Sequence, residues 1–126
     1  MEPGSTVLDG FCGAGGDSIQ FSIKGCKVIA NDIDEEKINC LTHNAKIYGA
    51  SGNIQTSTND FLKFQSPDQE LDTVYLAPPW GGTEYYESSS ISPGDFKPDL
   101  NDVLHKTFSL RPKSLMMLLP ANTDIE

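Results

Sequence analysis

Short apolar runs alternate along this chain with stretches in which apolar residues recur at helical spacing. A helix is predicted over residues 35–48, because Ile38, Leu41 and Ala45 recur along one helical face. Runs of apolar and β-branched residues predict buried strands at 6–9, 27–32, 53–56, 71–76 and 114–119. The remaining segments are predicted helices at 18–23 and 99–110 and an irregular loop at 81–99. The first helix should begin near Asp17 or Ser18, and Gly49 and Gly52 should end the second.

Strands that alternate with helices are typical of an α/β fold, an open parallel sheet with helices on both faces. Right-handed crossovers bring the carboxyl ends of such strands to one edge, where ligands bind. Acidic residues and a proline-rich segment follow the predicted strands at that edge: Asp9, Asp32, Asp60 and residues 77–80. The sequence therefore predicts a ligand site to which several strands contribute.

A glycine-rich turn at residues 10–16 follows the first predicted strand. Glycine allows the backbone to approach a ligand closely. The turn and Asp32 would suit either a dinucleotide or an adenosylmethionine, although Ser18 stands where a dinucleotide fingerprint needs a third glycine. Asp9 favours adenosylmethionine, because its charge would attract the ammonium of that ligand and repel a pyrophosphate.

Each of these acidic residues also has a purely structural interpretation. Asp9 can cap the turn that follows it. Asp32 can be a solvated acid or a helix cap, and Asp34 competes with it for either role. Asp60 and Phe61 could flank an adenine, or they could be a turn acid beside a core ring.

The segment from Ala77 through Pro78 and Pro79 to Trp80 is the candidate catalytic segment. Paired prolines hold the backbone extended and remove two amide donors, so neighbouring carbonyls are left to accept from an exocyclic amine. Such carbonyls would also stabilise the positive charge that develops on the amine. Trp80, the only tryptophan, can stack on a base, which is worth about 1–3 kcal/mol, or it can fold over the core.

Taken together, these motifs resemble the trimethylguanosine synthase family, which methylates N2 of the 7-methylguanosine cap on small nuclear and nucleolar RNAs. The resemblance covers nearly the whole chain. The segments that carry it are VLDGFCGAGG (7–16), IANDID (29–34), NA (44–45), NDF (59–61), APPWGG (77–82) and LPAN (119–122). It implies a Rossmann-like class I methyltransferase core, S-adenosyl-L-methionine as cofactor and capped RNA as substrate.

The resemblance also implies roles for single residues. The cofactor would contact Asp9, Phe11, Gly13, Gly15, Gly16, Asp32, Ile33, Asp60 and Phe61. Within this set, Asp9 and the glycines would face the methionine part, Asp32 the ribose, and Asp60 and Phe61 the adenine. The substrate base would contact Trp80, Asn44 and Asn122. A 7-methylguanine ring is cationic, which strengthens its stacking on an indole.

The composition argues against broad, charge-driven binding of nucleic acid. The net charge is −9, and the nine basic residues form no stripe. Long RNA would therefore need a protein partner or further sequence to supply affinity. The cysteines at 12, 26 and 40 lack metal-ligand spacing and are expected to be free thiols. No apolar run approaches the roughly 20 residues of a membrane span, so a nuclear or cytoplasmic location is expected.

Two residues and the length depart from the family pattern. Ala77 replaces a common serine and Ala121 a common arginine, and each change removes an expected cap contact. We expect one domain over residues 1–126, truncated at both ends, without the family's N-terminal helical extension or the last strands of the sheet. Three alternatives remain open. They are another RNA amino-group methyltransferase (guanine-N2 or adenine-N6), a remnant that binds cofactor or cap without turnover, and a nicotinamide-dependent oxidoreductase, for which no acid–base group is visible.

Overall fold

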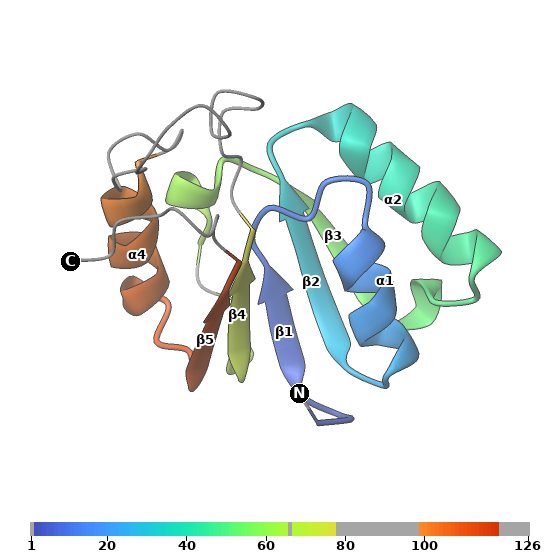
Figure 1. Ribbon diagram of the computed structural model, residues 1–126, viewed down its shortest axis with the longest axis horizontal. Helices are drawn as coiled ribbons and strands as arrows, with labels where there is room; N and C mark the ends of the chain where they lie inside the picture. The colour runs from blue at the N-terminus through green and yellow to red at the C-terminus, as the bar shows by residue number, and fades with distance from the viewer. Residues whose placement is uncertain (1, 66, 78–98, 119–126) are drawn as a thin grey trace, which may run out of the picture.

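The computed structural model describes residues 2–65, 67–77 and 99–118, which form a five-stranded sheet flanked by helices (Figure 1). The strand order is β3-β2-β1-β4-β5, and every pairing is parallel. The strands are β1 Thr6–Asp9, β2 Lys27–Asp32, β3 Ile54–Thr58, β4 Thr73–Leu76 and β5 Ser114–Met117. The predicted parallel sheet is confirmed, and β1 and β2 have the predicted bounds.

The other three strands differ from the prediction at their ends. β3 extends to Thr58, β4 begins at Thr73 rather than at 71, and β5 ends at Met117. Asp72 explains the late start of β4. Its amide donates to the carbonyl of Thr6 at 2.9 Å, and its carboxylate accepts from the amide of Thr6 at 2.8 Å. The Thr6 amide thus bonds a side chain of this segment and not its backbone.

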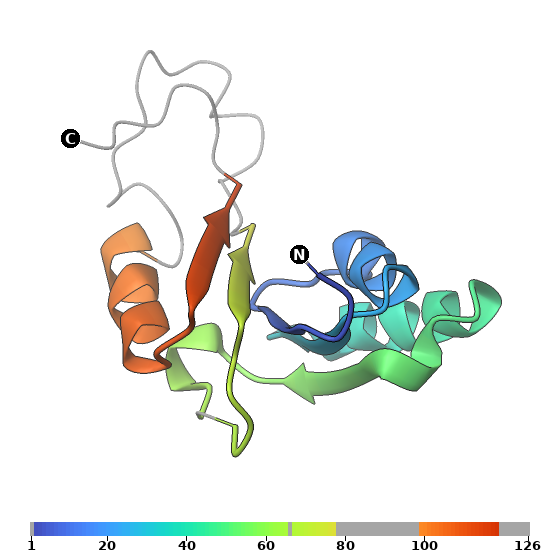
Figure 2. The same cartoon turned by 90° about the horizontal axis from the view of Figure 1, so that it is seen from below.

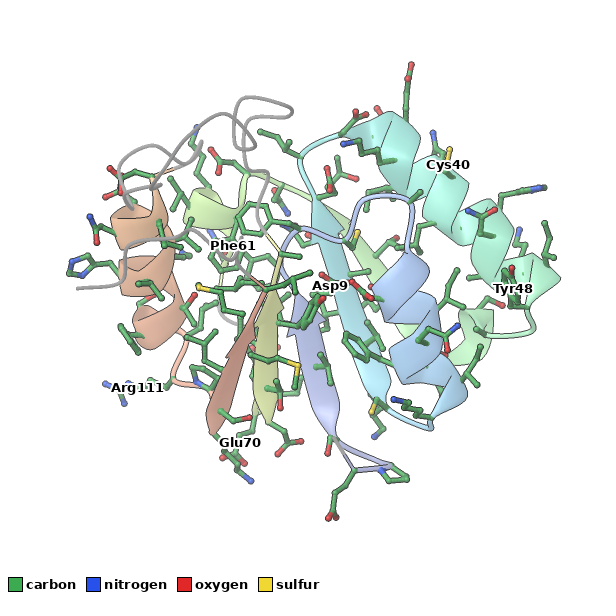
Figure 3. All side chains as sticks on the ribbon, viewed as in Figure 1. Asp9, Cys40, Tyr48, Phe61, Glu70 and Arg111 are labelled. Atoms are coloured by element: carbon green, nitrogen blue, oxygen red, sulfur yellow. The ribbon has the colours of Figure 1, made fainter. Side chains whose placement is uncertain are left out.

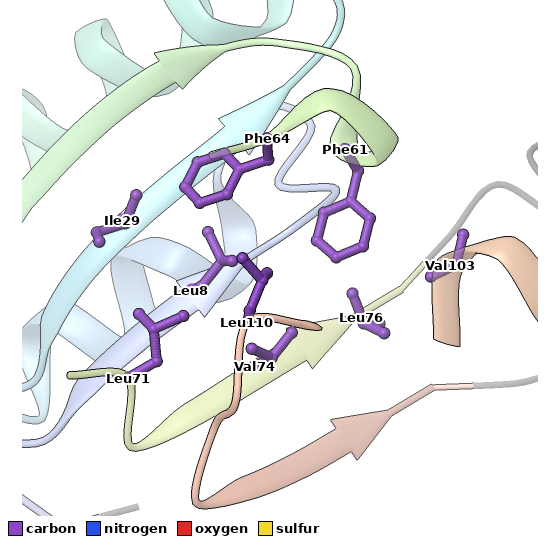
Figure 4. Packing of buried hydrophobic residues seen from close by; sticks show 9 residues of the cluster. All are labelled: Leu8, Ile29, Phe61, Phe64, Leu71, Val74, Leu76, Val103 and Leu110. Carbon is purple, nitrogen blue, oxygen red and sulfur yellow. The ribbon is translucent and has the colours of Figure 1, made fainter. Parts of the chain in front are cut away.

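Side chains alternate across the sheet and give it two buried faces. One face packs against α1 (Gly16–Ile23) and α2 (Glu35–Ile47), and its cluster includes Val7, Val28, Ala30, Ile38, Leu41, Tyr75 and the half-buried Phe21. The opposite face packs against α4 (Leu100–Ser109) and the short 3-10 helix η2 (Phe61–Lys63), with Leu8, Ile29, Phe61, Phe64, Val74 and Val103 in its cluster (Figure 4). Figure 2 shows α4 beside β5, away from α1 and α2. Helices on both faces are therefore confirmed.

Helix α1 begins at Gly16, earlier than the predicted 18–23, and its N-cap is Gly15 without a side-chain cap. Asp17 and Ser18 lie in the first turn but bond elsewhere. The Ser18 hydroxyl donates to Asp9 at 2.7 Å, and Asp17 accepts from the Tyr75 hydroxyl at 2.9 Å. These long-range contacts explain why a local capping pattern misplaced the start.

The ends of the other helices follow the sequence more closely. Asp34 caps α2 by accepting from the Glu36 amide at 2.9 Å. After α2, Gly49 has a φ of +66°, and the next amide, that of Ala50, donates back to the carbonyl of Ala45 at 2.8 Å. Gly49 therefore ends α2 as predicted, whereas Gly52 lies within the 3-10 helix η1 (Ser51–Asn53), so its predicted role in ending α2 was wrong. Helix α4 confirms the predicted 99–110 to within one residue at each end.

Gly15 combines a left-handed backbone with a close contact to α2. Its φ is +98°, and a Cβ placed there would lie 2.6 Å from Cγ of Leu41. Gly49 has a similar backbone, but nothing lies within 4 Å of its Cβ position. The approach of α2 to the glycine-rich turn therefore depends on the missing side chain at position 15.

We predict that Gly15→Ala lowers the free energy of unfolding by about 2–6 kcal/mol. A strained backbone costs about 1–3 kcal/mol, and overpacking against Leu41 adds a similar amount. Gly49→Ala is the matched control and should show the backbone cost alone. Urea unfolding of both variants measures these free energies. Equal losses of unfolding free energy in the two variants would show that the contact with Leu41 does not contribute.

Candidate functional site

A cavity of about 570 Å³ opens at the carboxyl edge of the sheet. This volume lies within the range of about 300–1,000 Å³ that is typical of small-molecule sites. Its walls are Gly10, Phe11, Gly13, Asp32, Ile33, Asp34, Lys37, Asn59, Asp60, Phe61 and Ala77. Segments that follow β1, β2, β3 and β4 thus meet around one space, as the strand-end pattern predicted.

Asp32 links the end of β2 to the glycine-rich turn. Its Oδ2 accepts from the Gly13 amide and its Oδ1 from the Asp34 amide, each at 2.9 Å. The side chain is therefore neither a solvated acid nor the cap of α2, which is Asp34. Each carboxylate oxygen can accept more than one hydrogen bond, so Asp32 can still accept from a ligand in the cavity.

Asp60 and Phe61 stabilise the local structure and also line the cavity. Asp60 caps η2 by accepting from the Leu62 amide at 3.0 Å, and Phe61 is only 2% exposed. Both residues also line the cavity. The Phe61 ring packs on Phe11 with centroids 5.2 Å apart, and a Cβ on Gly10 would lie 2.8 Å from it. Gly10 was predicted only as part of the glycine-rich turn and not as a site residue. Position 10 requires glycine because there is no space for a side chain.

Asn31 holds two of the turns together. It is fully buried, and its Nδ2 donates to the carbonyls of Gly10 at 3.2 Å and Asn59 at 3.1 Å. It joins the turn after β1 to the turn after β3. The available signal in the sequence was an amide side chain directly after the apolar residues 28–30.

Asp9 is a buried carboxyl group between the sheet and α1 (Figure 3). It is 1% exposed, Oδ2 accepts from Ser18, and Oδ1 has no partner among the residues that the structure describes. The pKa of Asp9 is raised from 3.8 to about 7, chiefly by burial and also by the nearby charges of Asp17 and Asp32, against the lowering effect of the hydrogen bond from Ser18. Asp9 is not part of the cavity wall, so its contact with a ligand stays a prediction.

Tyr75 connects β4 to the same region. Its carbonyl accepts from the Gly10 amide at 3.0 Å, and its hydroxyl donates to Asp17 at 2.9 Å. Burial and the carboxylate of Asp17 raise the pKa of Tyr75 to about 12, so its hydroxyl remains a donor at neutral pH. Through these bonds Tyr75 holds the strand that leads to Ala77 against the glycine-rich turn.

The other predicted residues fall into three groups. Ile33, 70% exposed, and the half-buried Ala77 line the cavity, as do Lys37 and Asn59, which the sequence did not indicate. Gly15, Gly16 and Asn44 do not line it, and Asn44 donates to the carbonyl of Ala14 at 3.4 Å. Pro78, Pro79, Trp80 and Asn122 lie outside the described residues.

Solved structures share this fold. TrmN from Thermus thermophilus matches 95% of this chain with a TM-score of 0.69 and 26% identity, and the match covers 35% of TrmN. A putative S-adenosylmethionine dependent methyltransferase from Listeria monocytogenes has a TM-score of 0.65 at 17% identity, over 91% of this chain and 45% of that protein. The architecture is that of S-adenosylmethionine-dependent methyltransferases.

Sequence similarity defines the family within this class. Residues 4–126 match the profile of the RNA cap guanine-N2 methyltransferases. Trimethylguanosine synthase of Schizosaccharomyces pombe is 36% identical over 125 residues, which cover 95% of this chain and 52% of that protein. The corresponding enzyme of Saccharomyces cerevisiae is 32% identical over 130 residues, or 99% of this chain and 41% of that protein.

The chain therefore belongs to the RNA cap guanine-N2 methyltransferase family, as its motifs indicated. It spans about half, or less, of the length of these curated relatives.

The cavity fits S-adenosylmethionine, the cofactor of this family. Asp32 offers acceptors for ribose hydroxyls, and Ile33 and Phe61 offer apolar surface for an adenine. The buried Oδ1 of Asp9, which has no partner among the described residues, is an acceptor suited to an ammonium group. Among the described residues, no helix is long and apolar enough to cross a bilayer. The same residues contain no cluster of three or more acidic, His or Cys side chains that could hold a metal ion.

We predict that Asp9 makes the stability of the ligand-free protein fall with rising pH. The unfolded chain releases this proton near pH 4, whereas the folded protein keeps it up to about pH 7. The free energy of unfolding should therefore fall between these values. Asp9→Asn cannot ionise and keeps an acceptor for Ser18. We compare the free energies of unfolding of this variant and of the unsubstituted protein at each pH. The difference should shift in favour of the variant by about 2–3 kcal/mol from pH 5 to pH 8.

Urea unfolding at the two pH values measures this difference. Asp68→Asn, at an exposed position, controls for the loss of one negative charge. A difference for Asp9→Asn that does not change with pH would rule out the titration of Asp9 in this range.

Proposed function

We propose that this chain transfers a methyl group from S-adenosylmethionine to N2 of the 7-methylguanosine cap of RNA, acting as one methyltransferase domain. Family membership supports the proposal. One structural observation carries it: Ala77, at the end of β4, lines the same cavity as Asp32, Asp60 and Phe61. The first residue of the catalytic segment thus borders the space that suits the cofactor.

Within this proposal the cofactor is held by residues from three strand ends. Asp32 accepts from the ribose hydroxyls while its bonds to Gly13 and Asp34 hold its carboxylate in place. Ile33 and Phe61 contact the adenine, and Asp60 accepts from the adenine amine. Asp9 pairs with the ammonium, which would stabilise the ionised form of a carboxyl group whose pKa is otherwise raised to about 7.

The chemistry asks little of the protein beyond position. When bound, S-adenosylmethionine supplies a methyl group that a positively charged sulfur already activates. The guanine N2 must lie in line with that methyl, and holding it there can account for most of the acceleration. N2 also loses one proton. A backbone carbonyl of residues 77–80 can accept a hydrogen bond from that N–H and orient it, and the proton passes to water. Trp80 stacks on the cationic base, with Asn44 and Asn122 at its edge.

A second candidate has its own support. Ala77 presents a methyl group where the family commonly has a serine, so the cavity wall has no side-chain hydroxyl there. A site without this contact could accept another exocyclic amine, guanine-N2 or adenine-N6 of RNA. Both candidates act on RNA in the nucleus or cytoplasm, with a protein partner adding affinity for long RNA.

We predict methyl transfer to 7-methyl-GTP and none to GTP, because only the methylated base is cationic. Trp80→Ala should abolish this transfer and leave the Kd for S-adenosylmethionine unchanged. Radiolabelled methyl transfer and calorimetry measure the two effects. Equal activity on 7-methyl-GTP and GTP would favour the second candidate, and binding without any transfer would indicate a non-catalytic remnant.

We predict that Asp32→Ala raises the Kd for S-adenosylmethionine about 10- to 100-fold, since hydrogen bonds to a charged group contribute about 1.5–3 kcal/mol. Asp34→Asn keeps the cap of α2 and tests the competing carboxylate, which also lines the cavity. It should raise the Kd less than Asp32→Ala does. If Asp34→Asn has the larger effect in calorimetry, the ribose contact belongs to Asp34 instead.

A further inference from the structure

A groove runs along β3, the strand at one edge of the described sheet. It consists of a cavity of about 590 Å³ and an adjoining one of about 250 Å³, which share Ile29, Gln55 and Gln69 as lining residues. The larger cavity also shares Asn59 with the proposed cofactor site. This β3 groove therefore starts beside the cofactor site and follows the strand, whose five residues extend over about 16 Å.

The walls of the β3 groove are neutral or basic and rich in hydrogen-bonding groups. The carboxamides of Gln55, Asn59, Gln65 and Gln69 line it, with the ammonium of Lys63. Ile29 and Phe64, which belong to the core under β3 (Figure 4), are its buried floor. Amides, hydroxyls and lysine are the groups that contact the sugar–phosphate backbone in protein–nucleic acid complexes.

Acidic side chains are absent from the described lining, although the chain has 18 of them. Three occur in the neighbouring sequence but not in the walls. Asp60 lines the cofactor cavity, Glu70 lies 3.7 Å from Lys113, and Asp68 is exposed without lining either cavity. Lys63 lies in the larger cavity and Lys27 in the smaller. A polyanion could therefore follow β3 without meeting a carboxylate in the groove.

We propose that the β3 groove binds a few nucleotides of single-stranded RNA adjoining the cap, with Lys63 at a phosphate and the carboxamides at sugars and base edges. The proposal rests on the proposed function, because it supplies the RNA affinity that the net charge of −9 denies to the surface at large. An extended polypeptide added to the edge of β3 would bind mainly through backbone hydrogen bonds. The lysines and carboxamides in the walls of the groove favour RNA over an added polypeptide strand.

The test compares the unsubstituted protein with the Lys63→Gln variant. Each is assayed on two substrates, 7-methyl-GTP and a capped, unstructured RNA of twelve nucleotides. We expect a higher kcat/KM for the capped RNA, which Lys63→Gln lowers about three- to tenfold, with no change on 7-methyl-GTP. Loss of one phosphate contact should also make the slope of log Kd against log salt shallower by about 0.7 for a single strand. Lys24→Gln, at the end of α1 and outside the groove, is the matched control and should change neither value.

A second measurement separates failure of this proposal from failure of the proposed function. Anisotropy of a fluorescent, uncapped twelve-nucleotide RNA reports groove binding without any methyl transfer. Lys63→Gln and, independently, Gln69→Ala should each weaken this binding while Lys24→Gln does not. The proposal that the β3 groove binds RNA would be overturned by equal binding of all three variants. It would also be overturned if the unsubstituted protein transferred methyl to both substrates with equal kcat/KM. Absence of transfer to 7-methyl-GTP together with Lys63-dependent RNA binding would overturn only the proposed function.

Discussion

The site depends on the side-chain amide of Asn31, which joins the ends of three neighbouring strands. Asn31 lies near the end of β2, and its two N–H groups donate to carbonyls in the turns after β1 and β3. A buried N–H group is costly unless it is hydrogen-bonded, so both turns are held where their carbonyls satisfy Nδ2, whereas Oδ1 of Asn31 has no partner among the described residues. The next residue, Asp32, then accepts from the amide of Gly13. Two successive residues of β2 thus place the glycine-rich turn, Asn59 and the carboxylate on the wall of one cavity.

Asp9 shows that this arrangement is not optimised for stability alone. At about 1.4 kcal/mol for each pH unit between 3.8 and 7, ionising this buried carboxyl group costs roughly 4 kcal/mol in the ligand-free protein. This cost includes the desolvation of Oδ1, which has no hydrogen-bond partner among the described residues. Groups that destabilise the free protein in this way are common in functional sites. Under the proposed function, the ammonium of the cofactor would offset this cost by pairing with the ionised carboxylate.

Under the proposed function, an acidic protein must keep its own carboxylates away from the path of the RNA. Here several acids are engaged in hydrogen bonds or ion pairs at the sheet. Asp60 caps η2, and Asp72 bonds the Thr6 amide and pairs with Lys113 at 3.3 Å, which keeps the pKa of Asp72 below its usual value. Neutral amides line the groove beside β3 instead. Binding can therefore depend on local composition while the net charge suppresses nonspecific association.

The sequence by itself determined the strands, the helices, the parallel sheet and the family, because periodicity and motifs are local properties of the chain. It also predicted that Asp32, Asp60, Phe61 and Ala77 would meet at one edge, since parallel strands bring their carboxyl ends together. Only the tertiary structure decided that α1 starts at Gly16, that Asn31 joins the turns and that Gly10 must be small. It also decided that a groove whose described lining contains no acidic side chain follows β3. Each of these depends on contacts between residues far apart in sequence, such as Tyr75 with Asp17. A pattern along the chain records which residues are polar, whereas only the folded packing decides which partner each polar group finds.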